Sequence, residues 1–244
     1  MHAIAYARRR VLACGEKLNW HEAIDENGFA ILPGLFSPEY LDRLLQEMNE
    51  LAAQRSRAGV RHALRFAPVA ELARGQQMIE LARQVLGPDA FPFRATLFDK
   101  SPTANWLVVW HQDTALPLRV RIETSGWGPW SVKEGIHYAH APAATLSKVL
   151  ALRVHLDDSS SKNGPLRVLP GTHKLGLLSD DSVHEVATRM VPVDCVAGKG
   201  AAVAMRPLII HSSSKSHEDA PRRVLHIEYA ASDSIAQPLQ LAIA

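Results

Sequence analysis

Trp106-Leu-Val-Val-Trp-His-Gln-Asp113 is an apolar run that ends in His-x-Asp, and Pro207-Leu-Ile-Ile-His211 ends a second apolar run in histidine. In an extended chain, residues i and i+2 point to the same side, so the side chains of His111 and Asp113 can converge while Gln112 faces away. Two imidazoles and one carboxylate on one face leave the opposite coordination positions free, which suits non-haem Fe(II). The two stretches therefore predict a metal centre at the ends of two strands.

Around these stretches the chain from about residue 91 onward is typical of short strands. The runs are rich in β-branched or aromatic residues, and clusters of Pro, Gly, Asn, Asp and Ser separate them. This pattern predicts a mainly β fold, an antiparallel sandwich or barrel, with helices packed outside. The expected strands are Phe29–Leu32, Phe93–Phe98, Trp106–Trp110, Val149–Leu156, Leu166–Leu169, Ala201–Met205, Leu208–Ile210 and Val224–Tyr229.

The first third of the chain is typical of helices. Ser37-Pro38-Glu39 carries a capping hydroxyl, a proline at the first helical position and an acid in the first turn. A second helix is expected over Gln76–Leu86, before the stop signal Gly87-Pro88. We expect one domain over 1–244, with a helical part over about 17–90, a β core over about 91–231 and a lid-like insertion over about 119–148. The apolar stripe of the first helix is Leu41, Leu44, Leu45, Met48 and Leu51.

The composition narrows the class of partner. In 244 residues, 27 Lys and Arg balance 25 Asp and Glu, which argues against a nucleic-acid or polybasic membrane surface and favours a small-molecule partner. No apolar run is long enough to predict a spanning helix. Two cysteines, Cys14 and Cys195, cannot build a disulfide scaffold or a Cys-only zinc site. Only three apolar residues lie between Arg8-Arg-Arg10 and Cys14, too few for a signal peptide, so we expect a cytoplasmic protein with reduced thiols.

Three motifs in a fixed order now carry a resemblance to a known family. They are Trp110-His-Gln-Asp113, then Asn163-Gly-Pro-Leu-Arg-Val-Leu-Pro-Gly-Thr-His173, then His211-Ser-Ser213 followed by Arg222. From about residue 25 to 231 the sequence resembles the phytanoyl-CoA dioxygenase family of Fe(II)/2-oxoglutarate-dependent oxygenases. The resemblance implies a double-stranded β-helix (a cupin-like jelly roll) flanked by helices. It also implies Fe(II), 2-oxoglutarate as co-substrate and O₂, with release of succinate and CO₂.

The resemblance implies a role for each matching residue. His111, Asp113 and His211 match the iron ligands, which are the catalytic centre of the family. Arg222 matches the arginine that pairs with the distal carboxylate of 2-oxoglutarate, and Ser213 matches the hydroxyl that assists it. Because Asp113 is present, the resemblance favours hydroxylation over halogenation, which needs a small residue at that position.

Three further residues are candidates for the co-substrate site. Thr96 and Asn105 fall where relatives contact 2-oxoglutarate. Arg153 stands where some relatives carry an aromatic residue, on a strand face that it shares with His155. If that face is interior, Arg153 is a buried cation in need of a carboxylate, either the 1-carboxylate of 2-oxoglutarate or an anionic group of the substrate. The alternative is a solvent-facing arginine.

The insertion over 119–148 offers candidates for substrate contact, although its aromatic residues are equally compatible with simple packing onto the core. A metal site at His137 and His140 is disfavoured, because no third ligand lies nearby at a suitable spacing. The substrate candidates are Trp127, Trp130, His137 and Tyr138.

The leading hypothesis is an oxygenase that oxidises a small organic molecule. One alternative is a protein that binds metal and 2-oxoglutarate without turnover. Another is a metal-dependent hydrolase or isomerase on the same fold, although such an enzyme has no need of the carboxylate-binding Arg222. The substrate and the oligomeric state do not follow from the sequence.

Overall fold

The computed structural model describes residues 19–48, 59–101 and 104–244. Cys14, the arginines before it and Leu51 lie outside these ranges. The helical elements are α1 (Trp20–Asn27), α2 (Pro38–Glu47), η2 (Ala63–Arg65), α3 (Ala67–Arg74), α4 (Gln76–Leu86), α5 (Ala143–Leu146), η3 (Thr172–Leu175), α6 (Asp180–Arg189) and η4 (Asp233–Ala236). The strands are β1 (Phe29–Leu32), β2 (Gly59–Val60), β3 (Phe91–Lys100), β4 (Val108–His111), β5 (Ala115–Leu118), β6 (Trp130–Lys133), β7 (Ile136–His140), β8 (Val149–His155), β9 (Leu166–Val168), β10 (Val193–Cys195), β11 (Ala202–Met205), β12 (His211–Ser213) and β13 (Arg222–Ala230).

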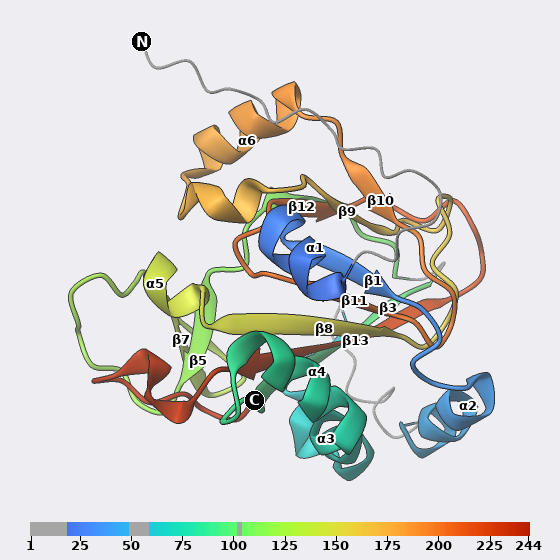
Figure 1. Ribbon diagram of the computed structural model, residues 1–244, viewed down its shortest axis with the longest axis horizontal. Coiled ribbons are helices and arrows are strands. Elements are labelled where there is room, and N and C mark those ends of the chain that lie inside the picture. The colour runs from blue at the N-terminus through green and yellow to red at the C-terminus, as the bar shows by residue number, and fades with distance from the viewer. Residues whose placement is uncertain (1–18, 49–58, 102–103) are drawn as a thin grey trace.

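Two antiparallel sheets form the body of the protein. The major sheet has the order β1-β11-β8-β13-β3-β2 and the minor sheet the order β10-β9-β12-β4. Eight of these strands make two facing sets of four, β11-β8-β13-β3 and β10-β9-β12-β4, which is a jelly-roll arrangement. Figure 1 shows β8 and β13 running the length of the molecule, with β9, β10 and β12 on one side and α3 and α4 on the other.

The alternation of side chains along β13 separates the packing face from the interior face. Leu225, Ile227 and Tyr229 point outward and pack in the apolar core that the helices α1 to α4 cover. The intervening His226 and Glu228 point inward and are buried between the sheets. Part of that interior is apolar, where Val203 and Met205 of β11 pack with residues of β9 and β10. The rest of the interior holds the polar and charged side chains, with Phe98 against His226 and Arg153.

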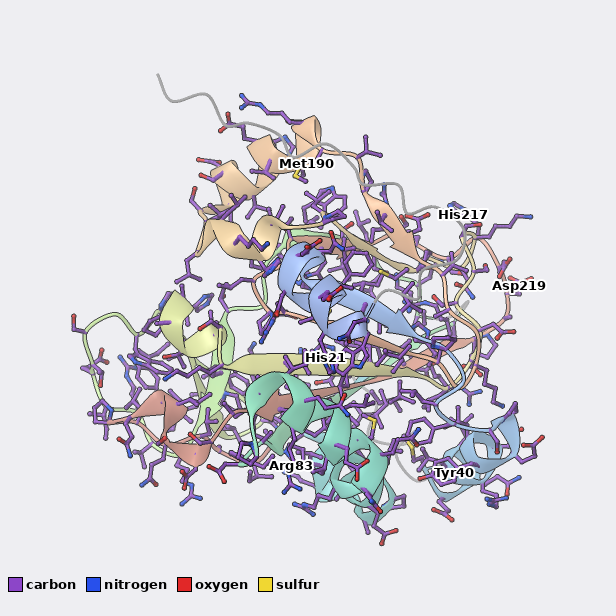
Figure 2. All side chains as sticks on the ribbon, in the orientation of Figure 1. His21, Tyr40, Arg83, Met190, His217 and Asp219 are labelled. Carbon is purple, nitrogen blue, oxygen red and sulfur yellow. The ribbon has the colours of Figure 1, made fainter. Side chains whose placement is uncertain are left out.

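Local signals explain the helices that cover the major sheet. The Ser37 hydroxyl accepts a hydrogen bond from the backbone N–H of Tyr40 (3.2 Å) and so caps α2. The helix α4 has the predicted bounds and packs its buried Met78 and Ala82 into the core. Figure 2 shows that side chains fill the space between α4, where Arg83 is labelled, and the sheet. In the described part of the chain, no helix combines the length and apolarity needed to cross a membrane.

Two segments differ from the expectation. The run Leu208–Ile210 is not a strand, because the N–H of Ile209 bonds to the carbonyl of Arg206 (3.1 Å) and turns the chain ahead of β12. The insertion over 119–148 is more regular than expected. The strands β6 and β7 form a hairpin around Glu134-Gly135 and pair with β5 in a third sheet of order β5-β7-β6.

Candidate active site

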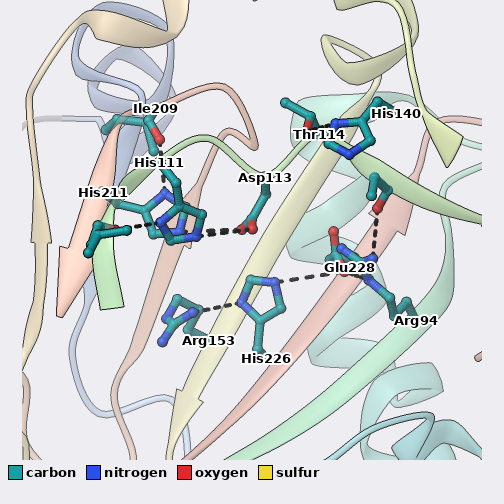
Figure 3. A network of polar contacts seen from close by, with 12 residues as sticks. Arg94, His111, Asp113, Thr114, His140, Arg153, Ile209, His211, His226 and Glu228 are labelled. Atoms are coloured by element: carbon teal, nitrogen blue, oxygen red, sulfur yellow. Dashed lines mark hydrogen bonds and ion pairs between the residues drawn. The ribbon is translucent and has the colours of Figure 1, made fainter. Parts of the chain in front are cut away.

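Three potential metal ligands meet where β4 and β12 lie side by side. His111 ends β4 and stands directly opposite His211, which begins β12. The two imidazole centroids are 4.2 Å apart. Asp113 lies two residues beyond β4, where its backbone N–H donates to the carbonyl of Pro207 (2.9 Å). One ligand atom from each of the three side chains lies within 4.8 Å of the others. Figure 3 shows the two imidazoles side by side, facing Asp113.

Both imidazoles present the same nitrogen to Asp113. The Nδ1 of His111 lies 2.9 Å from the carbonyl oxygen of Val109, and the Nδ1 of His211 lies 2.9 Å from that of Ile209. When each Nδ1–H donates to its carbonyl, each Nε2 keeps a free lone pair. These Nε2 atoms are 3.7 Å and 3.5 Å from the two carboxylate oxygens of Asp113. The donor set therefore fits one divalent metal ion with coordination positions to spare.

The electrostatics of the three side chains favour the ligand forms of Asp113 and His211. Burial would raise the pKa of Asp113, but the facing His211 and His111 hold it well below its usual range. Burial lowers the pKa of His211 to about 4, so its imidazole is neutral near pH 7. A carboxylate and a neutral imidazole are the protonation states that a metal ion requires.

Gln112, between two of the ligands, points away from them and fixes the local chain. Its Nε2 donates to the carbonyls of Gly176 and Leu208, at 2.8 Å each. Its Oε1 accepts from the backbone N–H of Leu178 (3.0 Å). Because Leu208 belongs to the turn before β12, this buried amide holds the two histidine-bearing segments in register.

Three buried cations, Lys100, Arg153 and Arg222, line the same interior; we call them the cation cluster. Lys100 and Arg222 are direct cross-strand neighbours on β3 and β13. Like charges placed opposite each other destabilise a sheet. None of the three forms an ion pair with a carboxylate of the described residues, and the Nε of Arg153 has no hydrogen-bond partner there. Such a cluster fits an anionic ligand.

Hydrogen bonds tie the cation cluster to β12 and to the Asn163-Gly164 loop. Lys100 Nζ donates to the hydroxyl of Ser213 (2.7 Å) and to the carbonyl of Ser214. Arg222 Nε donates to the carbonyl of Asn163 (3.2 Å). Gly164 has φ +68°, and a Cβ there would lie 2.3 Å from the Ser214 carbonyl oxygen, so this loop needs glycine.

Burial shifts the pKa of the cations in the direction expected without counterions. The pKa of Lys100 is lowered to about 7 by burial and by the neighbouring Arg222 and Arg153. That of Arg222 is lowered to about 10 by burial and by Arg153. Lys100 was not a sequence candidate. Its strand was expected to stop at Phe98, and only the register of β3 against β13 places Lys100 beside Arg222.

Arg153 begins a chain of polar contacts that crosses the floor of the interior (Figure 3). Its Nη1 lies 2.9 Å from His226 Nδ1, and His226 Nε2 lies 3.8 Å from a carboxylate oxygen of Glu228. Glu228 in turn accepts a hydrogen bond from Arg94 Nε, while Arg94 Nη1 donates to the carbonyl of Ala115 (2.8 Å). Arg153 is thus interior, and the solvent-facing alternative does not hold.

The two other co-substrate candidates lie in different settings. Thr96 is on β3, opposite His226 of β13, and so lies on the interior face. Asn105 uses both ends of its amide on the backbone of Ser216. Its Nδ2 donates to the Ser216 carbonyl (2.8 Å), and its Oδ1 accepts from the Ser216 N–H (2.7 Å). Asn105 therefore shapes the segment between β12 and β13.

The structure separates the four substrate candidates of the insertion. Tyr138 is buried on the hairpin face that points toward Arg94, whose guanidinium carbon is 5.8 Å from the Tyr138 ring centroid. His137 neighbours Tyr138 in β7 and so lies on the opposite face. Trp127 and Trp130 pack against the apolar cluster that holds Leu116 and Leu118. The structure therefore does not bring His137, Trp127 and Trp130 to the interior.

The fold is a jelly roll. Its minor sheet carries the two histidines next to Asp113, and its major sheet carries the cation cluster. These features define a metal-dependent protein of the double-stranded β-helix class. The profile of the family described as phytanoyl-CoA dioxygenase (PhyH) matches residues 24–224. The chain belongs to this family, which confirms the resemblance seen in the motifs and the predicted fold class.

Named relatives are oxygenases. The chain is 30% identical over 188 residues to an L-proline trans-4-hydroxylase of Streptomyces griseoviridis, a match that covers 66% of this chain and 62% of that protein. It is 23% identical to an ectoine dioxygenase of Nocardia farcinica, over 88% of this chain and 78% of that one. The solved structure of EctD from S. alaskensis with 2-oxoglutarate and 5-hydroxyectoine superposes with a TM-score of 0.67, at 20% identity, over 90% and 77% of the two chains.

Proposed function

We propose that this protein is an Fe(II)- and 2-oxoglutarate-dependent dioxygenase that hydroxylates, or otherwise oxidises, a small organic molecule. The observation that carries the proposal is that one interior holds both the His111, Asp113 and His211 ligands and a cation cluster that no described carboxylate neutralises. The named relatives are a proline hydroxylase and ectoine dioxygenases, which supports the same class. Bound Fe(II) would supply the activation of O₂ that the side chains cannot provide.

The cation cluster is suited to hold the dicarboxylate co-substrate. Arg222 and Lys100 are cross-strand neighbours that present one guanidinium and one ammonium, and the Ser213 hydroxyl beside Lys100 lies on β12, the strand that His211 begins. We assign this group to the distal carboxylate. Arg153 contacts His226 on the interior floor, and Asp113 is the carboxylate that most counteracts the lowering of its pKa by burial. We assign Arg153 to the carboxylate at the metal end, with Thr96 on the same interior face.

The protein's own contribution is positioning. The Nδ1 bonds of the two histidines orient the lone pairs, and the Gln112 amide holds their segments together. No described carboxylate pairs with the cation cluster, so a bound dicarboxylate would offset the repulsion among its three cations. Binding of 2-oxoglutarate should therefore order this interior and exclude water before the substrate is attacked.

The first test is an anaerobic titration of the Fe(II)-loaded protein with 2-oxoglutarate. We expect a visible metal-to-ligand charge-transfer band and, once O₂ is admitted, succinate. His111→Ala should lose both signals, while His184→Ala, at an exposed histidine of α6, should keep them. Iron that binds without producing the band would contradict the proposal and favour a hydrolase or isomerase. A band without succinate, even with substrate candidates, would favour a non-catalytic binding protein.

Arg153 has its own test. If it binds the co-substrate, Arg153→Met raises the concentration of 2-oxoglutarate needed to form the band. If it binds an anionic group of the substrate instead, the band forms normally and only substrate-stimulated succinate formation falls.

We further propose a small-molecule substrate rather than nucleic acid, and a cytoplasmic location. The near balance of charges supports the first, and the free, buried thiol of Cys195 agrees with the second. Cell fractionation with an antibody to the protein tests the location.

A further inference from the structure

A second group of charged side chains lies at the other end of the β3–β13 pair from Lys100 and Arg222. Arg94 and Glu228 are cross-strand neighbours there and form a buried ion pair. The polar chain through His226 places this pair on the same interior floor as Arg153 (Figure 3). The interior therefore has two charged ends, and the co-substrate assigned above occupies only one of them.

The hairpin β6–β7 adds a lysine to this second end. Lys133 Nζ lies 4.7 Å from the centroid of the Tyr138 ring, and the Arg94 guanidinium carbon lies 5.8 Å from the same centroid. The segment before η2 contacts the hairpin, since the Tyr138 hydroxyl lies 3.0 Å from His62 Nε2. Glu134, at the turn, pairs with Arg61 and His62, at 3.5 Å each.

The ammonium of Lys133 has no counterion among the described residues. It makes no hydrogen bond or ion pair with any of them, although the backbone of Lys133 pairs with Ile136 in the hairpin. Glu228 is already matched by Arg94, and Asp113 is committed to the metal. Burial lowers the pKa of Lys133, and the cations Arg94 and Arg61 lower it further. A half-buried ammonium in this setting is stabilised by an anion, which no described side chain supplies.

We propose that the substrate carries a carboxylate, which Lys133 binds at the face of Tyr138 beside the Arg94–Glu228 pair. This inference rests on the proposed oxygenase function and adds the substrate class. The hairpin then acts as the specificity element: it brings the cation that selects the anion, while the sheet floor holds the co-substrate. A long apolar chain without an anionic head is disfavoured by the same arrangement.

The test compares small acids with neutral partners of the same size: L-proline with L-prolinamide, L-pipecolate with its amide, and benzoate with benzamide. Calorimetry under anaerobic conditions measures their binding to protein loaded with Fe(II) and 2-oxoglutarate. We expect at least one acid to bind at least about 10-fold more tightly than its amide. Lys133→Met should abolish that preference, and Lys133→Arg should retain it. Lys174→Met, which removes an exposed lysine of η3, is the matched control.

Each contrary result has a distinct meaning. Equal binding of acids and amides, a preference that survives Lys133→Met, or no binding of any acid while the 2-oxoglutarate band forms normally would each overturn the substrate class alone. Absence of the band would instead count against the oxygenase. The same comparison of acids with amides is repeated with Zn(II)-loaded protein. It measures the preference of Lys133 for an acid without 2-oxoglutarate or turnover, so the substrate class and the oxygenase function can be refuted independently.

Discussion

Raising the pH from 7 to 9 should weaken the binding of 2-oxoglutarate, because Lys100 must be protonated to pair with a carboxylate. Burial and the neighbouring Arg222 and Arg153 lower the pKa of Lys100 to about 7 in the free protein. A bound carboxylate favours the charged ammonium and raises that pKa. Below pH 7 the ammonium is already formed. Above pH 7 binding must take up a proton, so affinity falls as the pH rises.

The size of the effect follows from this linkage. If the bound carboxylate keeps Lys100 protonated up to pH 9, the dissociation constant rises by about 50-fold between pH 7 and pH 9, or roughly 2.3 kcal/mol. Arg222, which faces Lys100, and His155, which lies near Arg222 and Arg153, titrate outside this window. Burial, Arg153 and Arg222 lower the pKa of His155 to about 3, and Arg222 itself has a pKa of about 10.

The measurement is calorimetric titration of metal-loaded protein in two buffers of different ionisation enthalpy. Proton uptake should be about one half at pH 7 and close to one above pH 8. In Lys100→Met the affinity should be weaker and independent of pH across this range, and Lys100→Arg should bind well with no proton uptake. A wild-type protein without proton uptake, or an unchanged pH slope in Lys100→Met, would refute the reasoning.

Three other variants test the rest of the site. Asp113→Ala should abolish succinate formation and weaken Fe(II) binding, as measured by metal titration, and full activity in this variant would remove Asp113 from the ligand set. Arg222→Ala should raise the dissociation constant for 2-oxoglutarate by roughly 10- to 100-fold, since a charge-assisted hydrogen bond contributes about 1.5–3 kcal/mol. Arg94→Met should destabilise the fold by about 3–5 kcal/mol, because it leaves the Glu228 carboxylate buried without its partner. Arg94→Met/Glu228→Gln should recover most of the lost melting temperature, and equal melting of the single and double variants would show that the ion pair does not matter.

Local sequence was enough to predict a strand leading to His111, but not the strand that carries His211, because the expected strand Leu208–Ile210 is a turn and His211 begins β12. The i, i+2 relation of His111 and Asp113 is a property of extended chain, and the helix α4 has strong start and stop signals, so its bounds agree with the prediction. The relation of these residues to His211 came from the resemblance and from the apolar run before each histidine. The register of β4 and β12 does place His111 opposite His211, although His211 begins its strand and does not end one.

The rest of the site depends on relations between distant strands. Nothing near Lys100 in the sequence indicates that Arg222 lies opposite it, because that pairing is set by the register of two long strands. The hairpin was missed for a different reason. Trp130–Lys133 and Ile136–His140 alternate, and Glu134-Gly135 between them is a two-residue turn, but the surrounding Pro and Gly residues obscured the pattern. Finding that hairpin would have separated Tyr138 from His137.

The alternation of outward and inward side chains along β13 has an evolutionary consequence. Leu225, Ile227 and Tyr229 anchor the helices, whereas the alternate positions, among them His226 and Glu228, face the chemistry. Mutations at one set of positions leave the contacts of the other set largely untouched, because neighbouring side chains point to opposite faces. Interior residues of β13 can therefore change together with their cross-strand neighbours on β3, as with Glu228 and Arg94, while the helical layer keeps its contacts. The lining of the interior can thus vary while the outward face of β13 continues to hold the helices.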